Sequence, residues 1–185
     1  MSDTIITVTP PGETTVSVTG PTTTVRTNQP TVPNPRYFGQ LVSTASQTNP
    51  VASAINLVTF TSLEEGEGVT LSNGNRINLA NAGTYCLNLV VNLTKTDSGA
   101  DDAYFWLRKN AADVANSTMR QALDGNNAHE LVLLQWMETV TAGQYLQVAW
   151  SSPDADMSLT YAAAGTTPTR PATPSVHAHI FQIGD

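Results

Sequence analysis

Apolar and polar residues alternate along much of the chain after residue 36, and this two-residue period is typical of β-strands with one buried face. The clearest case is the run Tyr85, Leu87, Leu89, Val91 and Leu93, in which every second residue is apolar. Asn88 and Asn92 lie between these positions and are polar. The pattern predicts a strand whose odd-numbered side chains lie in a core.

The same pattern predicts a succession of strands separated by turn residues, and no convincing amphipathic helix. The predicted strands cover residues 37–46, 55–61, 69–71, 75–79, 84–94, 103–108, 117–123, 130–140, 144–150, 158–163 and 176–183. Asn and Gly, which tolerate positive φ, mark turns at 72–75 and 124–127. A short helix competes with a strand only at 117–123. The sequence therefore predicts an all-β sandwich.

Residues 130–140 depart from the alternation because their apolar side chains occupy both faces of one strand. The apolar positions are Leu131, Val132, Leu133, Leu134, Trp136 and Met137. Such a strand is either central to a covered sheet or buried in a subunit interface. In a two-sheet sandwich the interface needs a second chain, and this segment is the best residue-level argument for an oligomer.

Residues 1–35 have a different character, rich in Thr, Val and Pro and without aromatic side chains. Short alternations around Ile6 and Val8, around Val16 and Val18, and at Val25 are each closed by Pro or Gly. Alone, such a segment buries too little apolar surface to fold. It is either a disordered linker or an arm that becomes ordered on pairing with other chains, and the alternation favours the arm. We expect an attachment arm at 1–35 and one domain at 36–185.

The charge balance argues against nucleic acid as a partner. The chain has 8 basic and 15 acidic residues, a formal net charge of -7, and only 12% charged residues. Phosphate backbones repel such a chain. The first residues lack a basic segment and a long apolar run, so we expect no signal peptide and no membrane helix. The single cysteine, Cys86, is expected to be a buried free thiol.

No sequence motif for a nucleophile, a phosphate loop or a zinc site is present, so we expect no enzyme and no cofactor. Acidic residues cluster in two predicted loops, at Asp97, Asp101 and Asp102 and at Asp154 and Asp156. Calcium is an alternative there, but neither cluster has EF-hand spacing, and solvated loops are favoured. Glu64, Glu65 and Glu67 are interpreted as part of an exposed flexible loop.

Two further groups are candidates for binding. His177 and His179 are two residues apart on one strand and share a face; across an oligomer axis such pairs can bind an anion or a metal, and protonation near pH 6 would loosen the assembly. An ordinary polar strand face is the favoured interpretation. Tyr104, Trp106 and Tyr161 form a candidate sugar-stacking platform, although such aromatic residues more often fill an interface.

Residues 36–185 resemble the C1q/TNF-type jelly roll in the version found in bacteriophage virion proteins. The resemblance lies in Phe60 and in the segments 83–87, 105–110, 142–148 and 179–184, in that order and spacing. Two positions depart from the family pattern: Ala111 stands where the hairpin usually has Gly, and Gln144 where an acidic residue is usual.

The resemblance implies a trimeric jelly-roll β-sandwich whose strands near both ends of the domain line the threefold axis. The expected trimer interface comprises Leu131, Leu133, Trp136, Met137, His177, His179 and Phe181. We therefore expect a bacteriophage virion protein, a trimeric capsid decoration or cement protein on the particle surface. Its arm would bind the major capsid protein or other virion proteins. The alternatives are the receptor-binding tip of a tail or head fibre that recognises host glycans, and a glycoside-acting enzyme, for which no carboxylate pair can be assigned.

Overall fold

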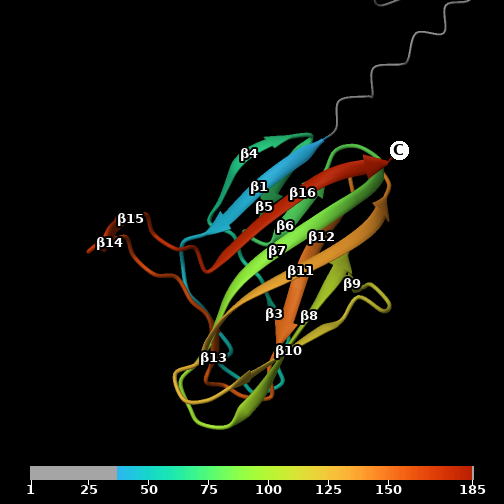
Figure 1. The fold of residues 1–185 in the computed structure, drawn as a ribbon. Helices are drawn as coiled ribbons and strands as arrows, with labels where there is room; N and C mark the ends of the chain where they lie inside the picture. The colour runs from blue at the N-terminus through green and yellow to red at the C-terminus, as the bar shows by residue number, and fades with distance from the viewer. Residues whose placement is uncertain (1–36, 185) are drawn as a thin grey trace, which may run out of the picture. The chain divides into compact units, whose positions relative to one another are not determined.

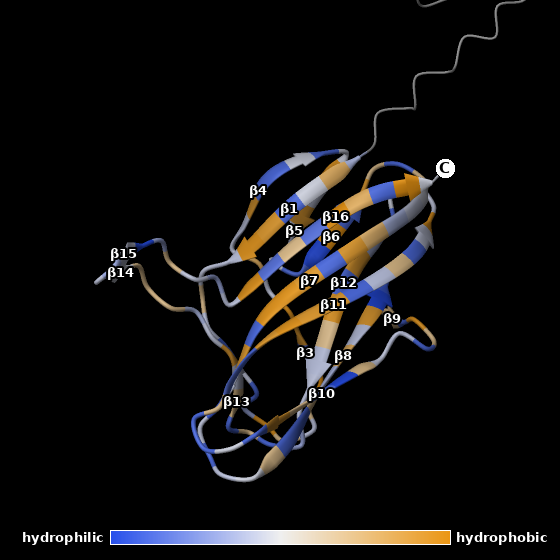
Figure 2. Cartoon of the chain, viewed as in Figure 1, coloured by the Kyte–Doolittle hydropathy of each residue, from blue (hydrophilic) through white to orange (hydrophobic). Residues whose placement is uncertain are grey.

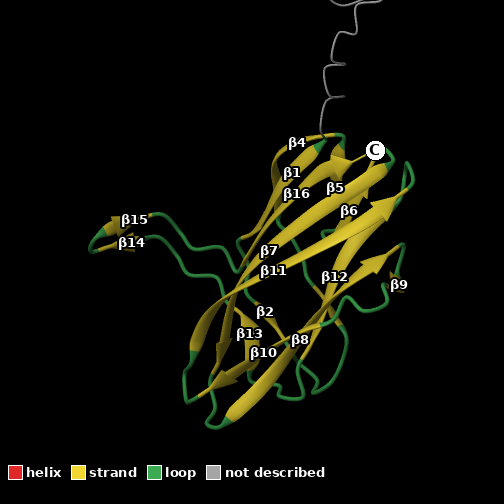
Figure 3. Cartoon of the chain, turned by 45° about the vertical axis from the view of Figure 1, so that its right-hand side comes forward, coloured by secondary structure: helices red, strands yellow, loops and turns green. Residues whose placement is uncertain are grey.

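A computed structural model describes residues 37–184, and the predicted attachment positions Ile6, Val8, Val16, Val18 and Val25 lie outside these residues. The described chain contains strands and loops but no helix, and hence no helix that could cross a membrane (Figure 3). The strands form two antiparallel seven-stranded sheets and one small hairpin. The all-β prediction is confirmed.

The first sheet, sheet A, is built around the long strand β7. Its strands are β1 (Phe38–Ser43), β2 (Gln47–Thr48), β4 (Ser62–Glu67), β7 (Gly83–Lys95), β11 (His129–Val140), β13 (Met157–Leu159) and β16 (Val176–Gly184). β11 pairs with one edge of β7 over almost its whole length, while β16 and β13 share the other edge. β1 then pairs with β16, and β4 with β1, so that five strands lie side by side (Figure 1).

The second sheet, sheet B, covers the inner face of sheet A. Its strands are β3 (Asn56–Leu57), β5 (Val69–Ser72), β6 (Arg76–Leu79), β8 (Ala100–Lys109), β9 (Ala112–Asp113), β10 (Met119–Asp124) and β12 (Tyr145–Ser151). The hairpin of β14 (Gly165–Thr166) and β15 (Thr169–Arg170) stands away from both sheets (Figures 1 and 3).

The core lies between the sheets and is made by the inward residues of the alternating strands. Tyr85, Leu87, Leu89, Val91 and Leu93 are all buried, as the two-residue period predicts. From sheet B, Phe105 and Trp150 are fully buried and stack with ring centroids 6.4 Å apart. The alternation therefore identifies the inner face correctly in both sheets.

Several elements differ from the prediction. Residues 62–67, interpreted as a flexible loop, form the strand β4 at the edge of sheet A. Its exposed glutamates gave the segment a loop-like composition, although charged side chains are common on edge strands. At 117–123, by contrast, the predicted strand is confirmed over the helix that competed with it, because Met119–Asp124 form β10. Asp101 and Asp102 lie in β8 rather than in a loop.

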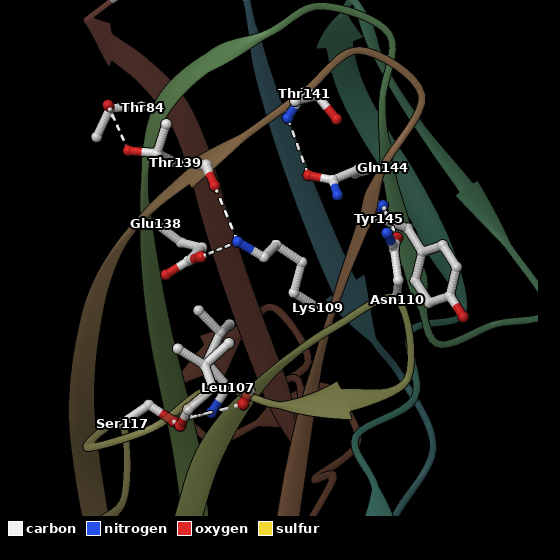
Figure 4. A network of polar contacts seen from close by, with 11 residues as sticks. Thr84, Leu107, Lys109, Asn110, Ser117, Glu138, Thr139, Thr141, Gln144 and Tyr145 are labelled. Carbon is white, nitrogen blue, oxygen red and sulfur yellow. Dashed lines mark hydrogen bonds and ion pairs between the residues drawn. The ribbon is translucent and has the colours of Figure 1, made fainter.

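Polar contacts from β8 of sheet B and from β7 of sheet A hold one end of β11 in place. Lys109 of β8 contacts the carboxylate of Glu138 and donates a hydrogen bond to the carbonyl of Thr139, at 3.1 Å (Figure 4). The hydroxyls of Thr139 and Thr84 lie 2.9 Å apart and connect β11 to β7. Sheet B therefore anchors one end of β11, and β7 supports it along its length.

Candidate functional site

The outward side of β11 exposes large apolar side chains to solvent. Leu131, Leu133 and Met137 are 66%, 72% and 66% exposed. The intervening Val132 and Leu134 are buried in the core. Because successive residues of a strand point to opposite faces, β11 is apolar on both sides, and only its inner side is covered within the described part of the chain.

Trp136 was expected in the same interface, and the structure contradicts this. Its side chain is buried on the inner face, and its indole N–H donates a hydrogen bond to the carbonyl of Ser117, at 2.6 Å. Trp136 has the opposite parity to Leu133 and Met137, so it cannot share their face. Its role is to fix β11 onto the core.

The exposed residues of β11 continue as rows across the outer face of sheet A, which is the face turned away from sheet B. Strand register places four residues in each of three rows. The rows are Phe38, Phe181, Cys86 and Met137; Gln40, His179, Asn88 and Gln135; and Val42, His177, Val90 and Leu133. A polar row thus lies between two rows that are mostly apolar, and Figure 2 shows apolar segments along β1, β16, β7 and β11.

Sequence reasoning missed part of this face. Phe38 and Ile183 are exposed, and Cys86 lies in the apolar row, where Gln135 donates a hydrogen bond to its sulfur at 3.3 Å. Cys86 is nevertheless buried, as expected. The parity of β1 and β7 was available as a signal, but the pairing that brings Phe38 beside Phe181 joins segments more than 140 residues apart.

The long edge of β11 is also uncovered. Among residues 37–184, β11 forms a backbone ladder with β7 alone, so the peptide groups of its other edge have no strand neighbour. A long, exposed, apolar edge strand favours pairing or packing with another chain. The edge and the outer face adjoin each other at Leu131, Leu133 and Met137.

Histidines are the only basic side chains of the three rows, while Glu65 and Glu67 of β4 lie beyond the rows, opposite Gln40 and Phe38. The three rows contain no Asp, Glu, Lys or Arg. His177 and His179 share the face as predicted, with ring centroids 4.4 Å apart. Burial lowers the pKa of His177 below its usual value, the neighbouring His179 lowers it further, and Glu64 opposes both.

The candidate sugar-stacking residues are not brought together. Tyr104 and Trp106 lie on the outward side of β8 in sheet B, whereas Tyr161 follows β13 of sheet A. The polar groups of the first two already have partners: the Tyr104 hydroxyl donates to Asp102 at 3.2 Å, and the Trp106 indole N–H donates to Asp113 at 2.9 Å. The three aromatic residues form no common platform.

The two acidic clusters, by contrast, meet at one end of the sandwich. One carboxylate oxygen each from Asp97, Asp154 and Asp156 lies within 4.8 Å of the others. The fully buried ammonium of Lys95 contacts Asp101 directly and lies 3.2 Å from Asp97. These carboxylates raise the pKa of Lys95 although burial alone would lower it. A built-in cation therefore balances part of the negative charge that would otherwise attract Ca²⁺.

Comparisons with known proteins give a fold and no family. No protein-family model matches the chain, and no curated protein matches it. Murine APRIL, in a crystal structure at pH 8.5, matches with a TM-score of 0.52 and 10% identity, covering 80% of this chain and 99% of that chain. The crystal structure of murine APRIL at pH 8.0 matches with a TM-score of 0.50 and 11% identity over the same shares. Residues 37–184 therefore have the fold of a TNF-like jelly roll.

Proposed function

We propose that this chain is a non-enzymatic structural protein of a virion surface that assembles as a homotrimer through the outer face of sheet A. The observation that carries the proposal is the exposure of Leu131, Leu133 and Met137 on one uncovered strand. Removing a Leu or Met side chain from water contributes about 1.5–3 kcal/mol. A face with three such residues on one strand is a strong candidate for an interface.

A second copy of this chain is the best occupant of the face. The chain carries a net charge of -7, so two copies repel each other over most of their surfaces. The three rows contain no acidic residue, and the acidic residues of this face, Glu65 and Glu67, lie at its β4 edge. Copies that meet over β16, β7 and β11 therefore bring no carboxylates into close contact. The exposed apolar side chains and the lack of acidic residues in the three rows favour self-association at this face.

The geometry favours a closed ring over a symmetric pair. The uncovered edge of β11 and the outer face of sheet A are different surfaces that meet along β11, so the edge of one copy can pack against the face of the next. Such a head-to-tail contact closes into a ring when the rotation permits it. The resemblance to the C1q/TNF-type jelly roll implies that the ring has three members.

The virion role rests on the sequence of the arm together with this assembly. Three chains joined at their sandwiches present three copies of residues 1–35, and linked weak contacts give avidity that one arm lacks. The proposed partners are the major capsid protein or other virion proteins. The arm would attach to them through Ile6, Val8, Val16, Val18 and Val25. Glycan recognition at a fibre tip is the weaker alternative, because Tyr161 lies on a different sheet from Tyr104 and Trp106.

Charged substitutions on β11 test the assembly. Leu133→Glu and Met137→Glu place a carboxylate at exposed positions, so the monomer should fold while the trimer dissociates. Matched controls are Val51→Glu and Ile55→Glu, because these residues are 61% and 59% exposed but lie outside the outer face of sheet A. Light scattering should give the mass of one chain for the β11 variants and of three for the controls. Dissociation of the controls to the same extent would contradict the proposed interface.

A second experiment tests the virion role. Particles stripped of the protein should lose resistance to heat or osmotic shock, and the full chain should restore it. A chain lacking residues 1–35 should remain trimeric but fail to bind the stripped particles. Unchanged particle resistance without the protein would argue against a cement function.

A further inference from the structure

His177 and His179 form a pair of imidazoles in the middle of the proposed interface. Both project from the outer face of β16, with ring centroids 4.4 Å apart and planes inclined by 52°. The Nε2 atom of His177 is buried and has no hydrogen-bond partner among the described residues. In the protonated ring, the Nε2–H group would therefore find no hydrogen-bond acceptor among the described residues.

The groups around the pair offer little to stabilise a positive charge. Across the ladder from β1, Val42 lies beside His177 and Gln40 beside His179. From β7, the corresponding neighbours are Val90 and Asn88.

Ionisable groups near the pair are few and lie at its margins. The Cys86 thiol is in the next row, opposite Phe181. On β4, Glu65 pairs with Gln40 and Glu67 with Phe38, and Glu64 is the acidic group that opposes the lowering of the His177 pKa. Burial and the adjacent His179 outweigh Glu64, so the net shift of the His177 pKa is downward. On this face the neutral form of His177 is favoured near pH 7.

Association through this face would bury the pair further. We propose that the His177–His179 pair makes assembly of the trimer pH-dependent, so that neutral imidazoles permit the contact and protonated imidazoles break it. This inference rests on the proposed function, because it assigns a control element to the same interface. Two cations side by side in a buried contact repel each other and lose hydration, and Glu64 compensates for this only in part.

The direction of the effect follows from proton linkage. Extra burial in the trimer lowers the His177 pKa below its value in the free chain, so the free chain binds more protons than the assembled one. Assembly is then fully favoured above the pKa of the free chain and is lost as pH falls through that value. The window lies at and below the usual histidine value of about 6.5. Dissociation should take up about one proton or more per chain between pH 7 and pH 5.

The test measures the mass of the full chain at pH 7.5 and pH 5.0 at equal ionic strength, with circular dichroism to follow the fold. We expect a trimer at pH 7.5 and dissociation to folded monomers at pH 5.0, reversed on return to pH 7.5. The double variant His177→Gln/His179→Gln keeps polar side chains without a titratable ring and should remain trimeric at both values.

The outcomes separate this inference from the function on which it rests. A chain that is monomeric at both pH values overturns the trimer itself. A chain that is trimeric at both values, or a double variant that still dissociates at pH 5.0, overturns the histidine control and leaves the trimer intact. If the double variant does not fold, the dependence of the dissociation constant of the unmodified chain on pH decides: proton uptake confined to pH below 5 indicates carboxylates and contradicts the proposal.

Discussion

Adjacent residues of β11 have opposite roles because they lie on opposite faces of sheet A. The Trp136 indole is buried and donates a hydrogen bond to the Ser117 carbonyl, whereas the Met137 side chain is 66% exposed. The fold of one chain depends on the first residue, and the proposed assembly depends on the second. Substitutions at these two residues therefore test whether the inner side of β11 stabilises the fold and its outer side the assembly.

Trp136→Phe should lower the free energy of unfolding of the chain by about 2–4 kcal/mol, through lost packing and an unpaired buried carbonyl. Met137→Ala should change the stability of the monomer little and weaken association. Denaturant unfolding of dilute monomer and light scattering of concentrated protein measure the two effects separately. Equal loss of monomer stability in both variants would contradict the assignment of faces.

The acidic cluster gives a second prediction at this scale. Asp154 accepts a hydrogen bond from the Asp156 N–H, which lowers its pKa, but burial and the carboxylates of Asp101 and Asp97 raise the pKa above its usual value overall. A carboxyl group whose pKa is raised by folding stabilises the fold when protonated, and this contribution is lost as pH rises through the folded value. Deprotonated Asp154 therefore destabilises the fold at neutral pH.

Asp154→Asn should remove that repulsion and keep the acceptor for the Asp156 N–H. We expect a higher melting temperature for the variant at pH 7 and a smaller difference near pH 3.5, where Asp154 is protonated. Thermal melts across this pH range provide the measurement. A variant less stable than the unmodified chain at pH 7 would contradict this. It would indicate that the Asp154 carboxylate stabilises the fold, for example as the ligand of a cation.

At the scale of elements, the β8–β9 hairpin shows a local conflict between sequence and backbone. Its two-residue turn consists of Asn110 and Ala111, with φ of 49° and 65°. A tight hairpin turn of this kind requires positive φ at both positions, and Asn tolerates it better than Ala. The family resemblance marks Ala111 as the departure from Gly, and the backbone retains the conformation that Gly prefers.

Ala111→Gly should therefore stabilise the hairpin by about 1 kcal/mol, and raise the melting temperature by a few degrees. The converse control is Gly143→Ala, at a turn where φ is 81° and no atom crowds the position; strain alone should make it destabilising. Calorimetry of the two variants checks both signs. A destabilising Ala111→Gly would mean that the Ala methyl group contributes more than its backbone strain costs.

The elements also show which features can be predicted from sequence. The alternation in β7 and β8 identifies the core-facing residues correctly, because a sandwich strand repeats its environment every two residues. In β12 it identifies Leu146, Val148 and Trp150, but Gln147 and Ala149 of the other side are also buried. The parity of β11 was equally available, and its use would have placed Trp136 inside and left Leu131, Leu133 and Met137 outside. Strand β4 was missed because the glutamates of an exposed edge strand have the composition of a loop.

For the whole molecule, the features that could not be predicted from sequence are those that depend on pairing between distant segments. The rows of the outer face join β1, β16, β7 and β11, whose order in the sheet differs from their order in the chain. The meeting of Asp97 with Asp154 and Asp156 likewise depends on the fold, since no local pattern links loops so far apart in sequence. The fold class could be predicted from local periodicity, and the composition of the site could not.

One sandwich leaves the apolar outer face of sheet A uncovered, and we propose that other copies of the chain cover it. Sedimentation equilibrium of the unmodified full chain, at neutral pH over a range of micromolar concentrations, tests it most directly. We expect a species with the mass of three chains of 19.6 kDa each. A stable, soluble species with the mass of a single chain at the highest concentration would contradict it.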